Sequence, residues 1–412
     1  MSNYRSSKNQ TIIKVQDREI SFFENFTKNS GIFWPKEQKD NGLLILSASL
    51  VGYIVTPYRT IKLPVKYSEI TFEHVLRMYL YLYTFRKNDD AKELDISPNS
   101  DDLDITKSFF RLLRKETSNG ILREYKPTNI HEKVVTGHVN WNKTLYNIKK
   151  MSNSPITTTK FSLSTDNPIN RLIVGALTKL TLSNKYSSTA IGFLEFFRDV
   201  KNPVKKNGAK HLQNIVFNSN TNRYRKLLNY ASMIIDNTDY NDMGKNTSVR
   251  SFLLNFDALY EDFVIKILTE ESHVQGFSTW NGMHALGHSS TFGDVTYQPD
   301  ILFKYQSEDP NNDYKEHAYG VLDCKNKAYS IFKNADVYQI ISYSRKLNSN
   351  YAILLYPSFE DTQPAVLNLD YDLFSPASIY AAFINISKDS GEEFLKSIKN
   401  FVKNVVSILQ YD

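Results

Sequence analysis

Short apolar runs separated by glycine and proline dominate the first part of the chain. Three of these runs, 43–46, 52–55 and 60–64, are rich in large and β-branched apolar residues, a composition typical of strands. Residues 71–86 follow with apolar positions spaced by three and four, the period of a helix that buries one face. We therefore predict a small α+β domain that ends near residue 86.

The middle of the chain has mainly helical periodicity. Asn167 followed by Pro168 is a good helix start, because Asn caps a helix and Pro is tolerated in its first turn. Ahead of this start, Gly137 indicates a turn and 139–141 a short strand. Helices are expected near 109–115, from 168 onward, over 191–197 and over 224–235.

The last part of the chain alternates between helical and strand patterns. A hairpin is expected over 277–293, and 351–357 is a near-continuous apolar run, which is typical of a strand covered on both faces. Two further strands, 298–303 and 319–325, lie between them. Amphipathic helices are expected over 255–269, 335–347 and 392–410. The order helix, strand, strand, helix, strand predicts an α/β core with a mixed central sheet.

These patterns predict an α+β multidomain protein with three segments. Residues 1–104 form an N-terminal α+β domain, 105–245 a mostly helical middle region and 246–412 the C-terminal α/β domain. The acidic stretch 89–104, which contains Pro and Ser, is expected to be a solvated linker or loop, with binding of a basic partner as the alternative.

Composition narrows the classes of function. The 412 residues carry a formal net charge of +6, with 26 Tyr and 25 Phe, so the chain is a folded protein for which an anionic partner such as DNA is allowed. Cys324 is the only cysteine, which excludes an intramolecular disulfide and a cysteine-based zinc site. The N-terminus lacks an apolar signal region and no run approaches transmembrane length, so we expect a cytoplasmic protein without a membrane partner.

Two acidic residues in neighbouring predicted strands are the strongest candidates for chemistry. Asp323 and Lys325 share one face of their strand, because side chains alternate along a strand, and Asp300 lies in the other strand. Two carboxylates about 4 Å apart repel by roughly 4 kcal/mol at an effective dielectric near 20, and a magnesium ion between them offsets this cost. Lys325 beside such a metal could polarise a phosphate or help to deprotonate water, which suits phosphodiester cleavage. The alternative is an ordinary ion pair of Asp323 with Lys325 on an exposed strand.

Other candidate motifs carry weaker signals. Gly244–Thr247 is not a nucleotide-binding loop, since Asp239 replaces the opening Gly and no apolar strand precedes it. His131 and His138 have no carboxylate or thiol at metal-binding spacing. A basic group is expected to form a solvated helix face, with contacts to the DNA backbone as the alternative. It comprises Lys201, Lys205, Lys206, Lys210, Arg223, Arg225 and Lys226.

The C-terminal third holds a set of motifs: Glu261 in LYEDFV, Pro299–Asp300, Asp323–Cys324–Lys325, Gln339 in ADVYQIISYS, and LLYP. This set resembles the PD-(D/E)XK nuclease fold, and within it the McrC subunit of McrBC-type 5-methylcytosine restriction systems, including the related LlaJI-type enzymes. Weaker likeness covers IKLPVK, GILREY with VTGHVNW, and NPINRLIVGAL. Cys324 departs from the Ala that is frequent in the family, and we expect it to pack in the core on the opposite strand face.

The resemblance implies a role for each matching residue. Asp300 and Asp323 would bind Mg²⁺, with Mn²⁺ as a substitute, and the backbone carbonyl of Cys324 would be a further ligand. Lys325 would orient or activate the attacking water. Glu261 would act at the metal or through its water shell, and Gln339 would position water or the phosphate backbone. Lys327, in register with Lys325, is expected to contact DNA or solvent.

The resemblance also implies partners. Members of the family cleave double-stranded DNA together with a separate AAA+ GTPase, the McrB-like motor, onto which the N-terminal part of this chain would dock. The chain itself is expected to bind no nucleotide. Two alternatives remain open at this point: a non-cleaving assembly factor that binds DNA or stimulates the partner NTPase, and a nuclease that needs no motor.

Overall fold

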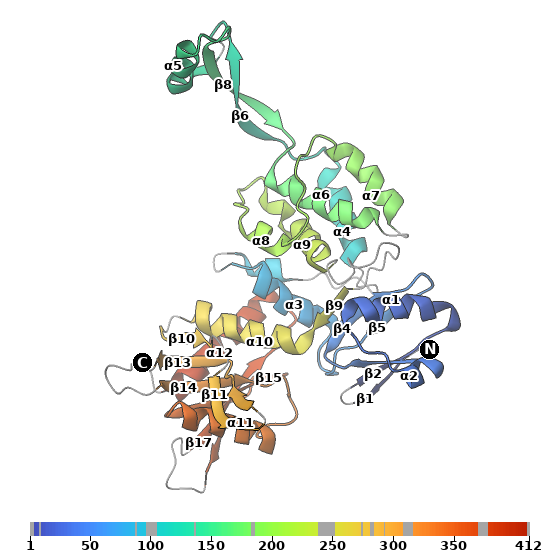
Figure 1. The fold of residues 1–412 in the computed structure, drawn as a ribbon, viewed down its shortest axis with the longest axis vertical. Helices are drawn as coiled ribbons and strands as arrows, with labels where there is room; N and C mark the ends of the chain where they lie inside the picture. Colours follow the sequence, from blue (N-terminus) through green and yellow to red (C-terminus); the bar gives the residue numbers. More distant parts are fainter. Residues whose placement is uncertain are drawn as a thin grey trace. The chain divides into compact units, whose positions relative to one another are not determined.

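A computed structural model gives the fold of the chain (Figure 1). It describes residues 4–7, 10–86, 89–95, 105–135, 137–182, 186–237, 252–272, 275–280, 284–291, 293–307, 316–369 and 378–409. By their contacts, Met1–Glu24, Phe33–Asn99 and Ser251–Asp412 form one compact unit, and Asn25–Ile32 and Ser100–Arg250 form a second. The division into domains at residues 104 and 245 stays a prediction.

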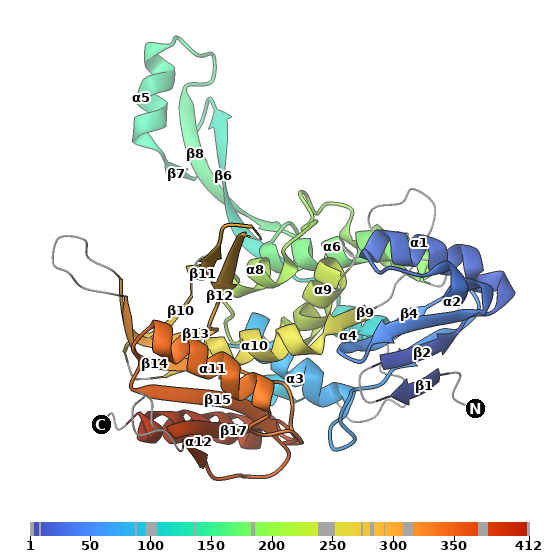
Figure 2. The same cartoon turned by 60° about the horizontal axis from the view of Figure 1, so that its bottom comes forward.

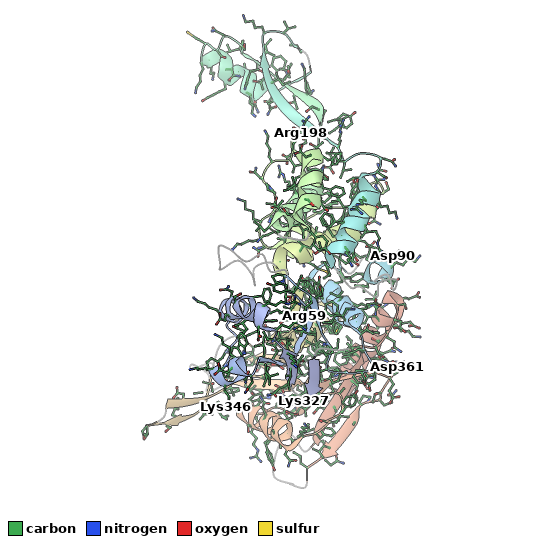
Figure 3. All side chains as sticks on the ribbon, turned by 90° about the vertical axis from the view of Figure 1, so that its right-hand side faces the viewer. Arg59, Asp90, Arg198, Lys327, Lys346 and Asp361 are labelled. Carbon is green, nitrogen blue, oxygen red and sulfur yellow. The ribbon has the colours of Figure 1, made fainter. Side chains whose placement is uncertain are left out.

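The N-terminal part of the first unit contains two small antiparallel sheets. The elements up to residue 83 are β1 (Tyr4–Ser7), β2 (Gln10–Lys14), α1 (Ile20–Ser30), α2 (Lys36–Asp40), β3 (Leu43–Ser47), β4 (Leu50–Val55), β5 (Thr60–Leu63) and α3 (Phe72–Tyr83). Residues 25–30 of α1 belong to the second unit. The three predicted strands and the helix predicted over 71–86 are confirmed, while β1, β2, α1 and α2 were not predicted. One sheet has the order β1-β2-β3. Arg59, labelled in Figure 3, forms a 2.7 Å ion pair with the fully buried Glu19 and so fixes the turn between β4 and β5.

The second N-terminal sheet is completed by a strand from far along the sequence. Its order is β5-β4-β9, and β9 (Phe252–Asn255) directly precedes the C-terminal part of the chain. Gly52 pairs with Leu253 in this ladder. A Cβ atom at Gly52 would lie 2.0 Å from the carbonyl oxygen of Phe252, so only glycine allows this approach. The N-terminal and C-terminal parts are therefore joined through a shared sheet.

The second unit combines helices with a long antiparallel ladder. Its elements are α4 (Ile105–Thr117), β6 (Glu124–Glu132), β7 (His138–Val139), α5 (Trp141–Lys149), β8 (Ile156–Ser164), α6 (Pro168–Thr181), α7 (Ser187–Leu194), α8 (Gly208–Gln213) and α9 (Arg225–Asn237). As predicted, the Asn167 side chain caps α6 by accepting from the Asn170 N–H. The strand predicted over 139–141 is partly wrong, because Asn140 caps α5 and Trp141 begins that helix. The ladder of β6 with β8 was not predicted.

The C-terminal part is built on a six-stranded mixed sheet, as the sequence indicated. Its order is β10-β13-β14-β15-β17-β16, with β14, β15 and β17 parallel and the outer strands antiparallel. The strands are β10 (Phe277–Thr279), β13 (Ile301–Gln306), β14 (His317–Cys324), β15 (Tyr351–Ser358), β16 (Ala365–Asn368) and β17 (Ser378–Asn385). The hairpin predicted over 277–293 lies instead at β11 (His284–Ser289) and β12 (Gly293–Tyr297), because β10 pairs with β13.

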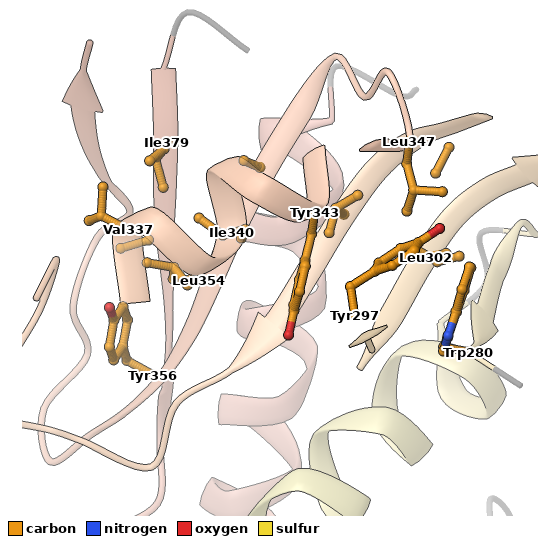
Figure 4. Close-up of a cluster of buried hydrophobic side chains, with 14 of the residues drawn as sticks. Trp280, Tyr297, Leu302, Val337, Ile340, Tyr343, Leu347, Leu354, Tyr356 and Ile379 are labelled. Atoms are coloured by element: carbon orange, nitrogen blue, oxygen red, sulfur yellow. The ribbon is translucent and has the colours of Figure 1, made fainter. Parts of the chain in front are cut away.

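Three helices flank this sheet: α10 (Phe256–Lys266), α11 (Asn334–Lys346) and α12 (Gly391–Ile408). Figure 2 shows α11 running along the strands. Its buried side chains Val337 and Ile340 pack with Leu302, Val321 and Leu354 of the sheet (Figure 4). On the other side, α10 and α12 are in contact through the stacked rings of Phe263 and Phe394. All three predicted helices are confirmed.

Some predictions concern residues only partly described. Of the acidic stretch 89–104, the described part contains a short helical turn, Ala91–Leu94, capped by Asp90, and Asp95 accepts a hydrogen bond from the Gly391 N–H. Its remainder and the Gly244–Thr247 loop lie outside the described residues. Within the described part of the chain, no helix is long and apolar enough to cross a membrane.

Candidate active site

The two candidate carboxylates lie side by side, one at the start and the other at the end of two antiparallel strands. Asp300 directly precedes β13, and Asp323 is the penultimate residue of β14. The antiparallel register pairs Ile301 with Leu322, which brings Asp300 opposite Asp323. The strand predicted over 298–303 begins only at Ile301, so Asp300 precedes it, and the two carboxylates meet at the edge of the sheet.

A hydrogen bond fixes Asp300 to the neighbouring strand. The backbone N–H of Cys324 donates to Asp300 Oδ2 at 2.6 Å. Since Asp300 stands outside the regular ladder of β13, its carboxylate replaces a strand partner for this N–H. The orientation of Asp300 thus depends on the end of β14.

Asp323 is almost fully buried and paired with Lys325. Only 2 % of Asp323 is exposed, and Lys325 Nζ forms an ion pair with Asp323 Oδ2. The backbone N–H of Lys325 donates to the carbonyl of Leu355 at 2.8 Å, which holds the residue beside the parallel strand β15. A same-face ion pair is present, but it is buried, unlike the exposed pair considered as the alternative.

Gln339 reaches the same place from α11. Its Oε1 accepts from Lys325 Nζ at 3.0 Å, and its Nε2 donates to the Tyr343 hydroxyl at 2.7 Å. Tyr343 is one turn further along α11, so the two side chains lie on one helix face. Lys325 is therefore held between a carboxylate and an amide oxygen.

Glu261 on α10 lies near this group without a direct contact to it among the described hydrogen bonds. Its side chain reaches solvent, yet partial burial raises its pKa, and the negative charges of Asp262 and Asp323 raise it further. Lys325 acts in the opposite direction. Glu261 is thus electrostatically coupled to Asp323 and Lys325.

Burial sets the charge balance of the site. Burial raises the pKa of Asp300 to about 6 and the pKa of Asp323 to about 7. A negative neighbour raises each pKa further: Glu261 acts on Asp300, and Asp300 acts on Asp323. For Lys325 burial lowers the pKa, but the carboxylates around it, Asp323 foremost, leave the pKa above its ordinary value. The ammonium stays charged, and the two carboxylates would gain from a second positive charge.

Cys324 lies between Asp323 and Lys325 in sequence, and its thiol is buried. Burial raises the pKa of the thiol well above its ordinary value, and Tyr260 of α10 is among the groups that interact with it. The thiol also interacts with Asp300 as a hydrogen-bond partner, so it does not pack against apolar groups alone as we expected. The residue as a whole is half-buried.

Sequence reasoning missed one carboxylate beside the site, Asp336 in the first turn of α11. It is 3 % exposed and pairs with Lys327 Nζ at 2.6 Å, and its charge raises the pKa of both Asp323 and Lys325. Lys327, labelled in Figure 3, was expected to contact DNA or solvent, and it is partly exposed but held by this ion pair. The signal was the spacing of three between Asp336 and Gln339, which puts both on one helix face.

The two histidines set aside in the sequence lie far along the chain from this group. His131 Nδ1 is 3.1 Å from both Asn147 Nδ2 and Thr157 Oγ1, and His138 begins β7. The basic residues between 201 and 226 lie at or near the surface of the second unit, and Arg223 is paired with Glu116 at 3.4 Å.

The donor set fits a hard divalent cation in part. Among the described residues, no three His, Cys, Asp or Glu side chains stand close enough together to bind a metal ion by themselves. Asp300 and Asp323 supply two carboxylates, and magnesium commonly takes only one or two from the protein and completes its shell with other oxygen atoms. The raised pKa values of both carboxylates show an electrostatic cost that a cation would relieve. These residues are therefore compatible with Mg²⁺.

Comparison with known proteins adds a family. Residues 46–357 match the family model of the McrBC 5-methylcytosine restriction system component. No curated protein matches the chain significantly.

Two solved structures are similar to the chain at low identity. One is a half-complex from a tetradecameric assembly of Thermococcus gammatolerans McrB AAA+ hexamers with bound McrC. There the identity is 17%, the match covers 94% of this chain and 93% of that one, and the TM-score is 0.48. The other is the cryo-EM structure of the Thermococcus gammatolerans McrBC complex. There the identity is 16%, the match covers 64% of this chain and 82% of that one, and the TM-score is 0.37. Both TM-scores are too low to establish a shared fold.

Proposed function

Because the chain belongs to the family of McrBC 5-methylcytosine restriction system components, we propose that it is the nuclease subunit of such a system. In this proposal it hydrolyses phosphodiester bonds of double-stranded DNA in the cytoplasm, and its C-terminal part is a PD-(D/E)XK nuclease. One observation supports this most strongly: Asp300, Asp323 and Lys325 meet at the ends of two paired strands.

Each residue of the group has a role in the proposed reaction. Asp300 and Asp323 hold Mg²⁺, for which Mn²⁺ substitutes, and the backbone carbonyl of Cys324 is a further ligand. When bound, the metal supplies Lewis-acid stabilisation of the charge that develops on the phosphate. Lys325 keeps its proton, which suits it to hold the attacking water or a phosphate oxygen by hydrogen bonds.

The helices place the remaining groups. Gln339 accepts a hydrogen bond from Lys325 and so keeps the ammonium directed toward the carboxylates. In the same place, Gln339 can also orient water or the DNA backbone. Glu261 has a raised pKa and reaches solvent, which suits a residue that acts through the water shell of the metal. In bulk water no polar group is held in a fixed position, whereas polar groups that the fold holds in place are a usual source of catalytic power.

We also propose that the chain acts with a separate AAA+ GTPase. It carries no nucleotide-binding loop of its own in this proposal, and it docks through exposed apolar side chains. In the described residues these gather on β6, α5 and β8 and the turns between them, more than on 1–104, where docking was expected. They are Tyr125, Val134, Val135, Trp141, Leu145, Tyr146, Ile148, Met151, Phe161 and Leu163. Apolar groups of this size on a surface are typical of protein–protein contacts.

A cleavage assay tests the proposed function. The purified chain is incubated with DNA containing 5-methylcytosine and Mg²⁺, with and without the AAA+ GTPase and GTP, and with EDTA in a parallel sample. Cleavage that requires Mg²⁺, partner and GTP supports the proposal. Cleavage by the chain alone would identify a nuclease that needs no motor. Stimulated GTP hydrolysis without any cleavage would identify an assembly factor instead.

A further inference from the structure

Two residues of the N-terminal part, Lys66 and Tyr67, contact the loop that follows β14, the strand that carries Asp323. Lys66 Nζ donates to the backbone carbonyl of Asn326 at 2.6 Å, and the hydroxyl of Tyr67 donates to the same carbonyl at 2.6 Å. The backbone N–H of Ala328 in turn donates to the Tyr67 hydroxyl at 3.2 Å. Asn326 directly follows Lys325, so these bonds fix the chain one residue beyond the proposed catalytic lysine.

The same contacts continue to the start of α10. Asn326 Nδ2 donates to Asp257 Oδ1 at 2.8 Å and to the backbone carbonyl of Phe256 at 3.3 Å. Asp257 Oδ1 also accepts from Lys66 Nζ at 2.5 Å, and Asp257 Oδ2 accepts from the Ser49 hydroxyl. Asp257 and Glu261 are four residues apart on α10 and therefore lie on one face of that helix.

Tyr67 and Asn326 are shielded from water, while the Asp257 side chain is 46 % exposed. Tyr67 is 5 % exposed, and its ring makes edge contacts with the rings of Phe256, Tyr329 and Phe359. The Lys66 side chain is 16 % exposed, with Nζ 5.2 Å from the centre of the Tyr67 ring. Hydrogen bonds in such an environment hold their geometry more strictly than exposed ones, because a broken bond leaves a buried group without a partner.

A purely structural role would be to join the N-terminal part to the sheet. That role is already served by the ladder between β4 and β9 and by Arg77, which donates to the backbone carbonyl of Asp389 at 2.5 Å. The Lys66 and Tyr67 contacts differ from these because they meet both the segment after β14, which holds Lys325, and the helix α10, which carries Glu261.

We propose that Lys66 and Tyr67 are positioning residues for the nuclease site: they set the end of β14 relative to the start of α10, and so the placement of Lys325 and Glu261. The proposal rests on the proposed function for its catalytic consequence. Its structural core, the dependence of the 324–328 backbone on Tyr67, does not need that function.

The test uses Tyr67→Phe and Lys66→Met in the full chain, with Tyr329→Phe as the matched control. Tyr67→Phe keeps the ring and removes only the hydroxyl that bonds Asn326 and Ala328. Tyr329 belongs to the same aromatic group as Tyr67, and its hydroxyl donates to Glu69. The control removes this hydroxyl, which makes no hydrogen bond with Asn326 in the described structure.

Two readouts separate this inference from the proposed function. The first is hydrogen exchange of the backbone amides in a peptide spanning 320–331 of the metal-free chain. Exchange is expected to be about tenfold faster in Tyr67→Phe, since the Ala328 N–H loses its acceptor, and unchanged in the control. The second is Mg²⁺-dependent cleavage with the GTPase partner, expected to fall about 10- to 100-fold in both variants, with stimulation of GTP hydrolysis kept.

Each outcome decides the proposal. Faster exchange in Tyr67→Phe together with slower cleavage in both Tyr67→Phe and Lys66→Met, and neither change in Tyr329→Phe, supports it. Unchanged exchange in Tyr67→Phe overturns it, and so does wild-type cleavage by Tyr67→Phe and Lys66→Met. If the wild-type chain does not cleave under any condition, the proposed function is wrong, and the exchange experiment still decides whether Tyr67 positions the end of β14.

Discussion

The backbone N–H of Cys324 donates a 2.6 Å hydrogen bond to the carboxylate of Asp300. This bond ties the first candidate metal ligand to the strand that carries the second, Asp323, and leaves the Cys324 carbonyl for another role. Any shift in register between β13 and β14 would separate the two carboxylates, because one step along a strand turns every side chain to the other face. The site is therefore a property of this one strand pairing.

Asp323→Asn is expected to make the stability of the metal-free chain depend less on pH between about pH 4 and about pH 8. Burial raises the pKa of Asp323 to about 7, whereas an aspartate in an unfolded chain has a pKa of about 3.9. The folded chain therefore binds the proton more tightly, and the resulting stability is fully present below about pH 4 and lost as the pH rises through about 7. Asn does not ionise and so lacks this loss.

Thermal unfolding in EDTA measures this effect. The Tm of the wild-type chain should fall more than that of Asp323→Asn between about pH 5 and about pH 8. Asp199→Asn, which changes an exposed carboxylate, serves as the control and should follow the wild type. Parallel pH profiles for Asp323→Asn and the wild type would show that Asp323 is not buried as described.

Cys324→Ala is expected to retain cleavage. The raised pKa of the thiol makes the thiolate, the nucleophilic form, scarce at neutral pH. The backbone N–H that donates to Asp300 and the backbone carbonyl that we propose as a metal ligand are unchanged by this substitution. Alkylation of the folded wild-type chain by iodoacetamide should also be much slower than alkylation of the unfolded chain. Loss of cleavage as complete as in Asp323→Ala would instead assign chemistry to the thiol.

Lys325→Met is expected to lower the cleavage rate by about 10²- to 10⁴-fold, the range found when a group that transfers or positions a proton is lost. Gln339→Ala should have a smaller effect, because the ammonium of Lys325 remains and only its Oε1 partner is removed. Tyr343→Phe is the control, since it removes the partner of Gln339 Nε2 and keeps the bond from Lys325. Single-turnover rates at saturating Mg²⁺ measure all three; equal rates for Lys325→Met and the control would refute the role of Lys325.

Substitutions on the β6–α5–β8 surface are expected to weaken binding of the AAA+ partner without unfolding the chain. Trp141 is 68 % and Tyr146 57 % exposed, so replacing either by Ala should change the free energy of unfolding by less than about 0.5 kcal/mol. If they contact the partner, each should cost more than about 1 kcal/mol of binding free energy. Phe33→Ala, which removes an aromatic ring that is 83 % exposed elsewhere, is the control. Calorimetric titration decides; undiminished binding by both variants would place the docking surface elsewhere.

The sequence predicted the C-terminal elements well because their periodicity follows from burial. Each of the helices α10, α11 and α12 has one apolar stripe, because one face of the helix is buried. The strand β15 has a continuous apolar run, because both of its faces are buried. The ladder of β6 with β8 was missed for the converse reason. In β8 the two fully buried residues, Thr157 and Thr158, are polar and adjacent, and the apolar Phe161 and Leu163 are exposed. Its sequence therefore carries no apolar face that burial would explain.

The candidate site was only partly accessible to sequence reasoning. The pairing of Asp323 with Lys325 follows from alternation along one strand, and the closeness of Asp300 depends on a strand register that spacing alone does not set. Asp336 was missed because its relation to Lys327 spans a loop and a helix start. The contacts of Lys66 and Tyr67 with Asn326 join residues about 260 positions apart, for which local pattern holds no signal.

The proposed cleavage of DNA by this chain depends on the Asp300–Asp323 pair. Its most direct test is single-turnover cleavage of DNA containing 5-methylcytosine by wild type and Asp323→Ala, each assembled with the AAA+ GTPase, GTP and Mg²⁺. We expect Asp323→Ala to lose cleavage while it still supports GTP hydrolysis, and the exposed-carboxylate variant Asp199→Ala to cleave like the wild type. Cleavage retained by Asp323→Ala would show that this pair does not carry the reaction.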